Sequence, residues 1–248
     1  MYTANWKQTS LAIVLLALLT TVTSGFRPRM GLRMDEAALS AAHSVMDMEE
    51  KLALYDQLEL GTMGLSRKAF EYALSGFSRL VDQGKVMKDD ILSILDFTLP
   101  SGKKRLFVID LESGKLLFNT YASHGRGSGK IIPTRFSNAV NSHKSSLGFY
   151  VTGETYQGQH GESLRLLGEE KGINDNALKR GIVMHGASYA DEDIIANQGF
   201  IGRSLGCPAL PQNVYRDIIE RIKDGSCLFI YSPDSYYLHH SKMIHQKA

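Results

Sequence analysis

The sequence predicts an α+β fold, in which a helical N-terminal segment is followed by a mostly β, sandwich-like domain. Two observations lead to this prediction. Up to about residue 81, apolar residues recur at three- and four-residue steps, as on one face of a helix. After about residue 90 they gather in short runs separated by turn residues, without the regular alternation of strands and helices that a parallel sheet requires.

The first 24 residues have the composition of a secretory signal peptide. Lys7 precedes an uncharged apolar run from Leu11 to Val22, and small residues follow it. The run is shorter than the ~20 apolar residues that a membrane span needs. We expect cleavage, no stable membrane span afterwards, and export to the periplasm or cell envelope. An uncleaved N-terminal anchor is the alternative.

A helical region is predicted over residues 25–95, and its first residues, 25–33, form a basic lead-in. Its first helix covers residues 34–60, and Ser66 is the predicted N-cap of a second helix that stops at Gly84. The sequence does not indicate what this region does.

The β domain is predicted over residues 96–234. Its strands are predicted at apolar runs, the first two of which are joined by the turn LESGK. They are predicted at 105–110, 116–122, 147–156, 163–168, 181–185 and 227–232, with one helix at 213–225. Residues 235–248 form a polar tail that we expect to be solvated.

Composition argues against several classes of function. The net charge is +2 and no basic stripe dominates, so nucleic acid is not the expected partner. The eight histidines are scattered, and no HExxH or CxxC motif occurs, so no metal or other cofactor is expected. The glycine-rich run at 123–130 lacks the spacing of a phosphate-binding loop and is predicted to be a flexible loop over a groove.

One cysteine and one histidine could carry chemistry. Cys207 lies in the loop GFIGRSLGCPALP, and His185 ends the apolar run GIVMH. An imidazole that accepts the thiol proton lowers the thiol pKa and creates a nucleophile, and backbone N–H groups of a glycine-containing loop can bind an oxyanion. Two alternatives stay open: a core histidine, and a disulfide between Cys207 and Cys227, the second cysteine. Ser204 matches G-x-S-x-G, but the surrounding pattern is not that of an α/β-hydrolase.

The motifs together resemble a known family. HGA at 185–187 followed by GRSLGC at 202–207 resembles the L,D-transpeptidase (YkuD-like) signature. The surrounding sequence resembles the murein L,D-transpeptidase catalytic domain branch of that family. Further similar segments are SHGRGSG, FSN, SSLG, GQHGESLRL and RGIVMHGASY. The similarity runs from about residue 60 to 233 and is densest from 124 to 209.

The resemblance implies a role for each matching residue. Cys207 matches the nucleophile, His185 the base, and Gly186 the residue whose carbonyl orients the imidazole. Ser204 and Gly206 match the fixed positions of the S-x-G-C motif and are assigned to substrate binding.

One position departs from the family, because Ala209 stands where many members carry Arg or Asn. Another side chain must then bind the substrate carboxylates, and the candidates are Arg203, Arg165 and Arg180.

The activity implied is thioester formation on a peptidoglycan stem tetrapeptide. Attack of an amine on the thioester gives a cross-link, and attack of water gives L,D-carboxypeptidase activity. The sequence does not indicate which of the two outcomes applies. It does not indicate an oligomeric state. The alternatives from other classes are a non-catalytic cell-wall-binding protein and a secreted cysteine peptidase, which would need a side chain to orient its histidine.

Overall fold

The computed structural model describes residues 48–245, which all belong to one unit. The predicted signal peptide, the lead-in, the start of the first predicted helix and the last residues of the tail lie outside the described residues. Residues 48–57, the described end of that helix, are helical. Within residues 48–245, no helix is long and apolar enough to cross a membrane.

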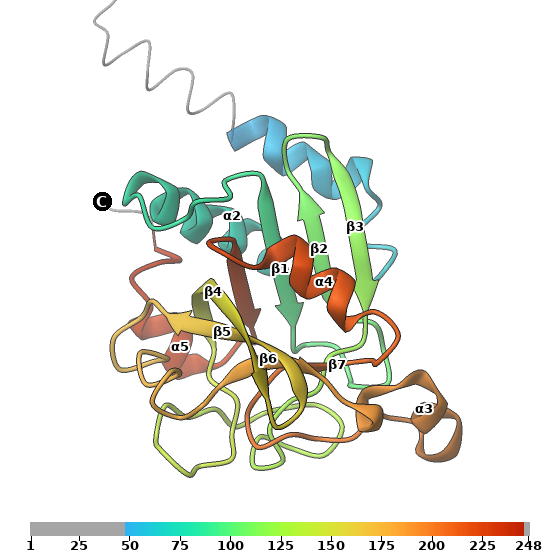
Figure 1. Cartoon of the computed structure of the whole chain (residues 1–248). Helices are drawn as coiled ribbons and strands as arrows, with labels where there is room; N and C mark the ends of the chain where they lie inside the picture. Colours follow the sequence, from blue (N-terminus) through green and yellow to red (C-terminus); the bar gives the residue numbers. More distant parts are fainter. Residues whose placement is uncertain (1–47, 246–248) are drawn as a thin grey trace, which may run out of the picture. The chain divides into compact units, whose positions relative to one another are not determined.

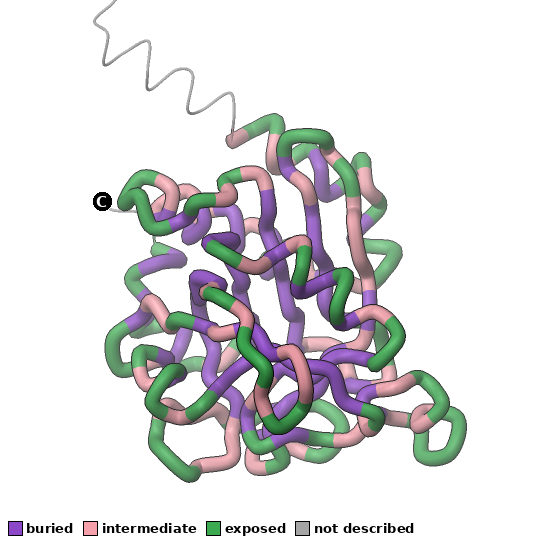
Figure 2. The backbone as a smooth tube through the Cα atoms, in the orientation of Figure 1, coloured by how far each residue is buried: buried purple, intermediate pink, exposed green. Residues whose placement is uncertain are grey.

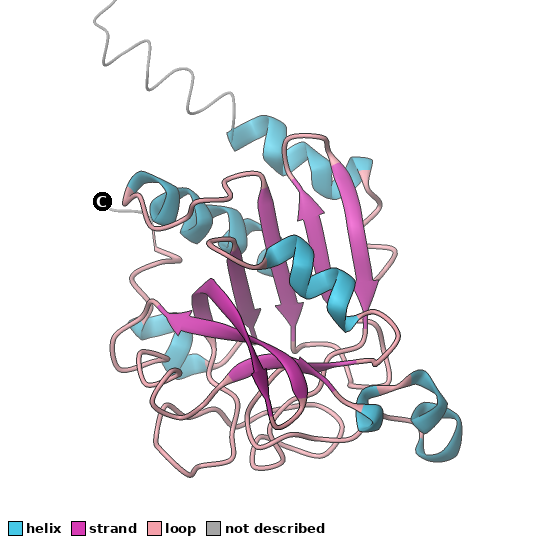
Figure 3. Cartoon of the chain, in the orientation of Figure 1, coloured by secondary structure: helices cyan, strands magenta, loops and turns pink. Residues whose placement is uncertain are grey.

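One eight-stranded sheet organises the fold, in the order β3-β2-β1-β8-β4-β5-β6-β7 (Figure 1). In Figure 3, β5, β6 and β7 run across the direction of β1, β2 and β3, so the sheet curls. The strands are β1 (Ile91–Asp96), β2 (Leu106–Asp110), β3 (Lys115–Thr120), β4 (Gly148–Gly158), β5 (Gly161–Gly168), β6 (Val183–Gly186), β7 (Ala209–Leu210) and β8 (Cys227–Tyr231). The α+β prediction is confirmed.

Strands β1 and β8 are neighbours inside the sheet, run parallel and are buried along their whole length (Figure 2). The sequence prediction missed β1 and began the β domain at residue 96. The apolar residues of ILSILD recur at steps of three and four residues, which fit a helix face as well as a buried strand, so the run gave no clear strand signal.

Two helices pack on the sheet. In Figure 1, α2 (Arg67–Asp82) lies behind it, against β1 and β8, and α4 (Tyr215–Ile222) lies in front, against β5 and β6. Ser66 caps α2 as predicted, because its hydroxyl accepts the N–H of Ala69 at 3.4 Å. A Cβ at Gly76 would lie 2.0 Å from the Phe149 ring, so a glycine lets the helix approach the sheet closely. The remaining helices are η1 (Ser188–Ala190), α3 (Glu192–Gln198) and α5 (Ser235–His240).

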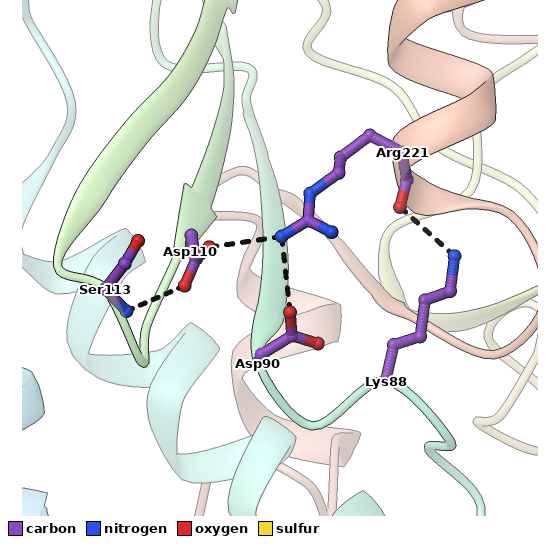
Figure 4. Close-up of polar contacts among 5 residues, drawn as sticks. All are labelled: Lys88, Asp90, Asp110, Ser113 and Arg221. Atoms are coloured by element: carbon purple, nitrogen blue, oxygen red, sulfur yellow. Dashed lines mark hydrogen bonds and ion pairs between the residues drawn. The ribbon is translucent and has the colours of Figure 1, made fainter.

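Ion pairs hold α4 against the ends of β1 and β2 (Figure 4). The guanidinium of Arg221 lies 3.3 Å from Asp90 and 3.1 Å from Asp110. Asp110 also accepts the N–H of Ser113 at 2.8 Å, and Lys88 donates to the carbonyl of Arg221 at 3.3 Å. The helix that packs over the candidate site's strands is thus fixed to the opposite half of the sheet.

The C-terminal segment differs from the solvated tail that we predicted. Tyr237 of α5 is buried, and its hydroxyl donates to Glu170 at 3.1 Å. Ser241 donates to the other carboxylate oxygen of Glu170, and Met243 and Ile244 are also buried. The buried carboxylate gives this segment polar partners inside the protein, which a count of its polar residues does not reveal.

Candidate active site

His185 lies near the end of β6, between β5 and β7. In the sheet register it pairs with Ser163 on one side and with Ala209 on the other. The chain turns into η1 directly after Gly186, so the imidazole stands where the strand ends. Ala209 is fully buried opposite it, so no polar side chain takes the place that many family members fill at this position.

The imidazole of His185 is oriented by a backbone carbonyl. Its Nδ1 lies 2.9 Å from the carbonyl oxygen of Gly186. A carbonyl only accepts, so Nδ1 carries the proton and Nε2 keeps a free lone pair. Burial lowers the pKa of His185, the Gly186 carbonyl raises it, and the nearby His160 lowers it, with a net lowering. The ring is therefore a neutral base in the resting state.

The thiol of Cys207 lies beside the start of β6. Its Sγ donates to the carbonyl of Gly181 at 3.6 Å and accepts the N–H of Val183 at 3.5 Å. Across the residues that the structure describes, no hydrogen bond joins Sγ to His185. The two side chains thus belong to adjacent segments, and a change in the thiol's hydrogen bonding is needed before proton transfer.

The environment of Cys207 raises its thiol pKa, whereas we expected a neighbouring imidazole to lower it. Burial is the largest cause, and the N–H of Val183 and the charge of Arg180 oppose it. The expected lowering depends on an imidazolium close to sulfur, and His185 is neutral and not bonded to the thiol. The resting pair is therefore a neutral thiol and a neutral imidazole.

Ser204 and Gly206 shape the turn that presents Cys207. The hydroxyl of Ser204 accepts the N–H of Gly206 at 3.0 Å and donates to the carbonyl of Cys207 at 2.6 Å. Gly206 has a φ of +134°, and a Cβ there would lie 2.8 Å from Ile182 and 3.0 Å from the carbonyl of Lys144. The position therefore requires glycine.

Neighbouring loops also bind the main chain around Cys207. Ser123 donates to the carbonyl of Cys207 at 3.2 Å and accepts the N–H of Ala209 at 3.0 Å. Ser145 donates to the carbonyl of Gly206 at 3.3 Å. The glycine-rich run 123–130, which we predicted to be a flexible loop over a groove, is instead partly buried and hydrogen-bonded to the cysteine loop.

A buried arginine anchors the glycine-rich run. Arg105 is fully buried and donates to the carbonyl of Ala122 at 2.7 Å and to Nδ1 of His124 at 2.8 Å. Burial and the charge of Arg105 lower the pKa of His124 to about 3, so this ring is neutral and its Nε2 donates to Gly129 at 3.3 Å. His124 is accordingly a structural residue.

Of the three arginines proposed to bind substrate, Arg180 lies nearest the thiol. It is half-buried and donates to the carbonyls of Ser137 at 2.8 Å and Lys144 at 2.5 Å. Its charge favours the thiolate of Cys207. Arg180 therefore holds the loop beside the cysteine and supplies positive charge to it.

The other two arginines occupy different positions. Arg165 lies two residues from the β5 partner of His185, so the two side chains share a face of the sheet, and it forms an ion pair with Glu154 at 3.3 Å. Arg203 is exposed and donates to the carbonyl of Gly129 at 3.1 Å. Arg165 thus lies on the sheet face of His185 with its guanidinium over Tyr156 of β4, whereas Arg203 contacts the glycine-rich run.

The arrangement of the cysteines and of other ligand side chains bears on the disulfide and on a metal site. Both cysteines are free, and Cys227 is fully buried in β8, so the disulfide is not formed. Between residues 48 and 245, no group of three or more His, Cys, Asp or Glu side chains is arranged to hold a metal ion.

Two residues near the pair were not singled out from the sequence. The ring of His160 stacks on His185, with centroids 4.4 Å apart. Tyr189 of η1 follows the histidine, and burial together with the nearby Cys207 raises its pKa to about 12. Both lie in segments that carry the family resemblance, GQHGESLRL and RGIVMHGASY, and this resemblance is the sequence feature that could have identified them.

The fold and the site define a class: an α+β domain that brings a loop cysteine beside a strand histidine. The family model described as L,D-transpeptidase catalytic domain matches residues 62–231, more than half of the chain. The chain belongs to this L,D-transpeptidase catalytic domain family, as its motifs predicted.

Solved structures of L,D-transpeptidases are similar to this chain over part of its length. One from Mycobacterium smegmatis is 14% identical with a TM-score of 0.37, covering 58% of this chain and 59% of that one. L,D-transpeptidase 3 from Mycobacterium tuberculosis is 12% identical with a TM-score of 0.38, covering 58% and 61%. This chain thus spans less than two thirds of either. No curated protein sequence matches it. At these low TM-scores, membership rests on the family model.

Proposed function

We propose that this protein is an exported peptidoglycan L,D-transpeptidase that uses Cys207 as nucleophile and His185 as general base. The observation that carries the proposal is the hydrogen bond between Nδ1 of His185 and the Gly186 carbonyl at 2.9 Å. It leaves Nε2 unprotonated on the strand beside the cysteine. No acidic side chain is needed for this orientation, which argues against the secreted cysteine peptidase alternative.

The first step forms a thioester. The Cys207 thiol gives its proton to Nε2 of His185, and Sγ bonds to the carbonyl carbon of the third, L-configured residue of a stem tetrapeptide. The bond from that carbonyl to the nitrogen of the fourth, D-configured residue then breaks, and the imidazolium returns the proton to the departing amine.

The developing oxyanion needs a donor in the cysteine loop. Among the described residues, the N–H of Cys207 donates to no oxygen, whereas the N–H of Gly206 is already bonded to Ser204. The Cys207 N–H is therefore the group that we assign to the oxyanion.

The second step resolves the thioester. His185 accepts a proton from an attacking amine of a neighbouring stem peptide, the carbonyl carbon bonds to that nitrogen, and the sulfur leaves and is reprotonated. Water in place of the amine gives a carboxylate and L,D-carboxypeptidase activity. Arg165, on the same face as His185, and Arg180, beside the thiol, are the side chains that we assign to the substrate carboxylates.

The test is turnover of tetrapeptide muropeptides by variants of the two cysteines. Cys207→Ala should abolish release of the fourth residue with an unchanged thermal midpoint. Cys227→Ala, the matched control in the buried strand, should retain turnover at temperatures where it is folded. Undiminished release by Cys207→Ala contradicts the proposal, and casein cleavage by the wild type would indicate a peptidase. N-terminal sequencing of the exported protein tests cleavage near residue 24.

A further inference from the structure

His160 lies at the tip of the β4–β5 hairpin, directly against the catalytic candidate His185. Gly158 and Gly161 form the last pair of the hairpin, so Gln159 and His160 make its two-residue turn. The ring centroids of His160 and His185 are 4.4 Å apart, and their planes are inclined by 17°. This is an offset-stacking distance, close enough for each ring to affect the other.

The hairpin tip is positioned by its own strand. Ser163 donates to the carbonyl of Gly161 at 3.1 Å, and Ser163 is the register partner of His185. His160 itself is exposed, and its ring nitrogens bond no other residue in the described part of the chain. The hairpin thus holds one face of the His160 ring against His185 and leaves its nitrogens open to solvent.

The charge on His160 decides what this stack does. A neutral aromatic face attracts a cation, so neutral His160 favours the imidazolium that His185 becomes after accepting a proton. A protonated His160 places a like charge against that imidazolium and disfavours it. Consistent with this, His160 lowers the pKa of His185, after burial as the largest cause.

We propose that His160 is a positioning residue, which holds the His185 ring and supports its imidazolium while neutral and withdraws that support when protonated. The inference rests on the proposed function of His185 as general base.

Other charged or titratable groups near the stack belong to four segments. Glu162 and Arg165 lie on β5, and Tyr215 of α4 packs against Gly186 with Arg216 donating to its hydroxyl at 3.1 Å. Arg180 and Cys207 lie on the loops beside β6. Among the described residues, His160 is the neighbour whose charge acts on the His185 pKa, so its removal should move that pKa.

Three substitutions separate the aromatic face from the charge. His160→Phe keeps the face and cannot be protonated, His160→Ala removes both, and His160→Lys supplies a fixed positive charge. Gln159→Ala changes the other residue of the same turn and is the matched control. Both positions, 159 and 160, are exposed, and a thermal melt of each of the four variants checks folding.

The direct readout is an NMR titration of the His185 ring, which requires no turnover. His160→Phe should raise the His185 pKa relative to the wild type, His160→Lys should lower it, and Gln159→Ala should leave it in place. An unmoved His185 pKa in both the Phe and Lys variants overturns the proposal, because a merely structural turn residue would change only the thermal midpoint.

The second readout is kcat/KM on tetrapeptide muropeptides, measured in mildly alkaline buffer. His160→Ala should lower kcat/KM by about three- to tenfold, as expected for loss of one cation–π contact. His160→Phe should recover most of that loss, and His160→Lys should lie below His160→Ala. Wild-type activity in the Lys variant overturns the proposal. Retained activity in Cys207→Ala would instead overturn the proposed function and leave the NMR result interpretable.

Discussion

The hydroxyl of Ser204 donates to the carbonyl oxygen of Cys207 across 2.6 Å, and so closes the turn that presents the thiol. The same hydroxyl accepts the N–H of Gly206, and the N–H of Cys207 has no oxygen partner among the described residues. One side chain therefore binds the turn on both sides of the N–H that we assign to the oxyanion.

Ser204→Ala should lower kcat/KM on muropeptides by about 10- to 100-fold, because the turn loses both bonds and the nucleophile is displaced. The free energy of unfolding should fall by about 1–2 kcal/mol, since two buried groups lose a partner. Ser188→Ala, at an exposed serine of η1, is the control and should change neither quantity. Wild-type kcat/KM in Ser204→Ala would contradict this role.

Gly206→Ala should fold poorly and lose turnover. A Cβ at this φ of +134° would lie 2.8 Å from Ile182, so backbone strain and a clash act together. We expect a loss of about 1–3 kcal/mol in the free energy of unfolding, measured by urea denaturation. Gly172 is the matched control, with a φ of +80° and nothing within 4 Å of its Cβ. Equal losses in the two variants would show that the clash contributes nothing.

The reactivity of Cys207 should depend on Arg180. Burial raises the thiol pKa and the Arg180 charge opposes this, so removing the charge raises the pKa further. The pH midpoint for alkylation by iodoacetamide should therefore move upward in Arg180→Met and much less in Arg180→Lys. Arg203→Met, an exposed control, should leave the midpoint in place. A downward shift in Arg180→Met would refute the assigned sign.

A carbapenem should acylate Cys207 and spare Cys227. The thiol opens the β-lactam carbonyl as it would open the peptide, and the whole β-lactam mass is retained on the protein. Cys227 is fully buried in β8, and burial raises its thiol pKa, so it should remain unmodified. Peptide mapping by mass spectrometry identifies the site, and an adduct on neither cysteine would count against the nucleophile assignment.

Glu170 should make stability depend on pH. Burial raises the pKa of this carboxyl, while the Ser241 hydroxyl, the Phe149 N–H and the Tyr237 hydroxyl oppose the rise. The folded state therefore binds the proton more tightly than the unfolded state. The free energy of unfolding should fall as pH rises from the unfolded pKa of about 4.3 through the raised folded pKa. Glu170→Gln, which cannot titrate, should flatten this slope in denaturation curves. An identical slope in Glu170→Gln would contradict the assignment.

Much of the sheet could be predicted from the sequence because its strands are short apolar runs bounded by turn residues. The run ending at His185 forms β6, and the helix capped by Ser66 follows the expected helical periodicity. Strand β1 could not be predicted this way, because the three- and four-residue steps between its apolar residues fit a helix face as well as a buried strand.

The candidate site was predictable in its residues and less so in its electrostatics. Motif spacing placed His185 and Cys207 together, but the direction of the thiol pKa depends on burial and on the distance to imidazole, which no spacing encodes. The stack of His160 on His185 depends on the register of a hairpin and could be found only in three dimensions.

The three serines around the nucleophile, Ser123, Ser145 and Ser204, all bind main-chain atoms of residues 206–209. The side chain of Leu205, within the same turn, is 55% exposed and bound by none of these hydroxyls. Exchange of residue 205 should therefore leave in place the three hydroxyl contacts that fix the main chain around Cys207.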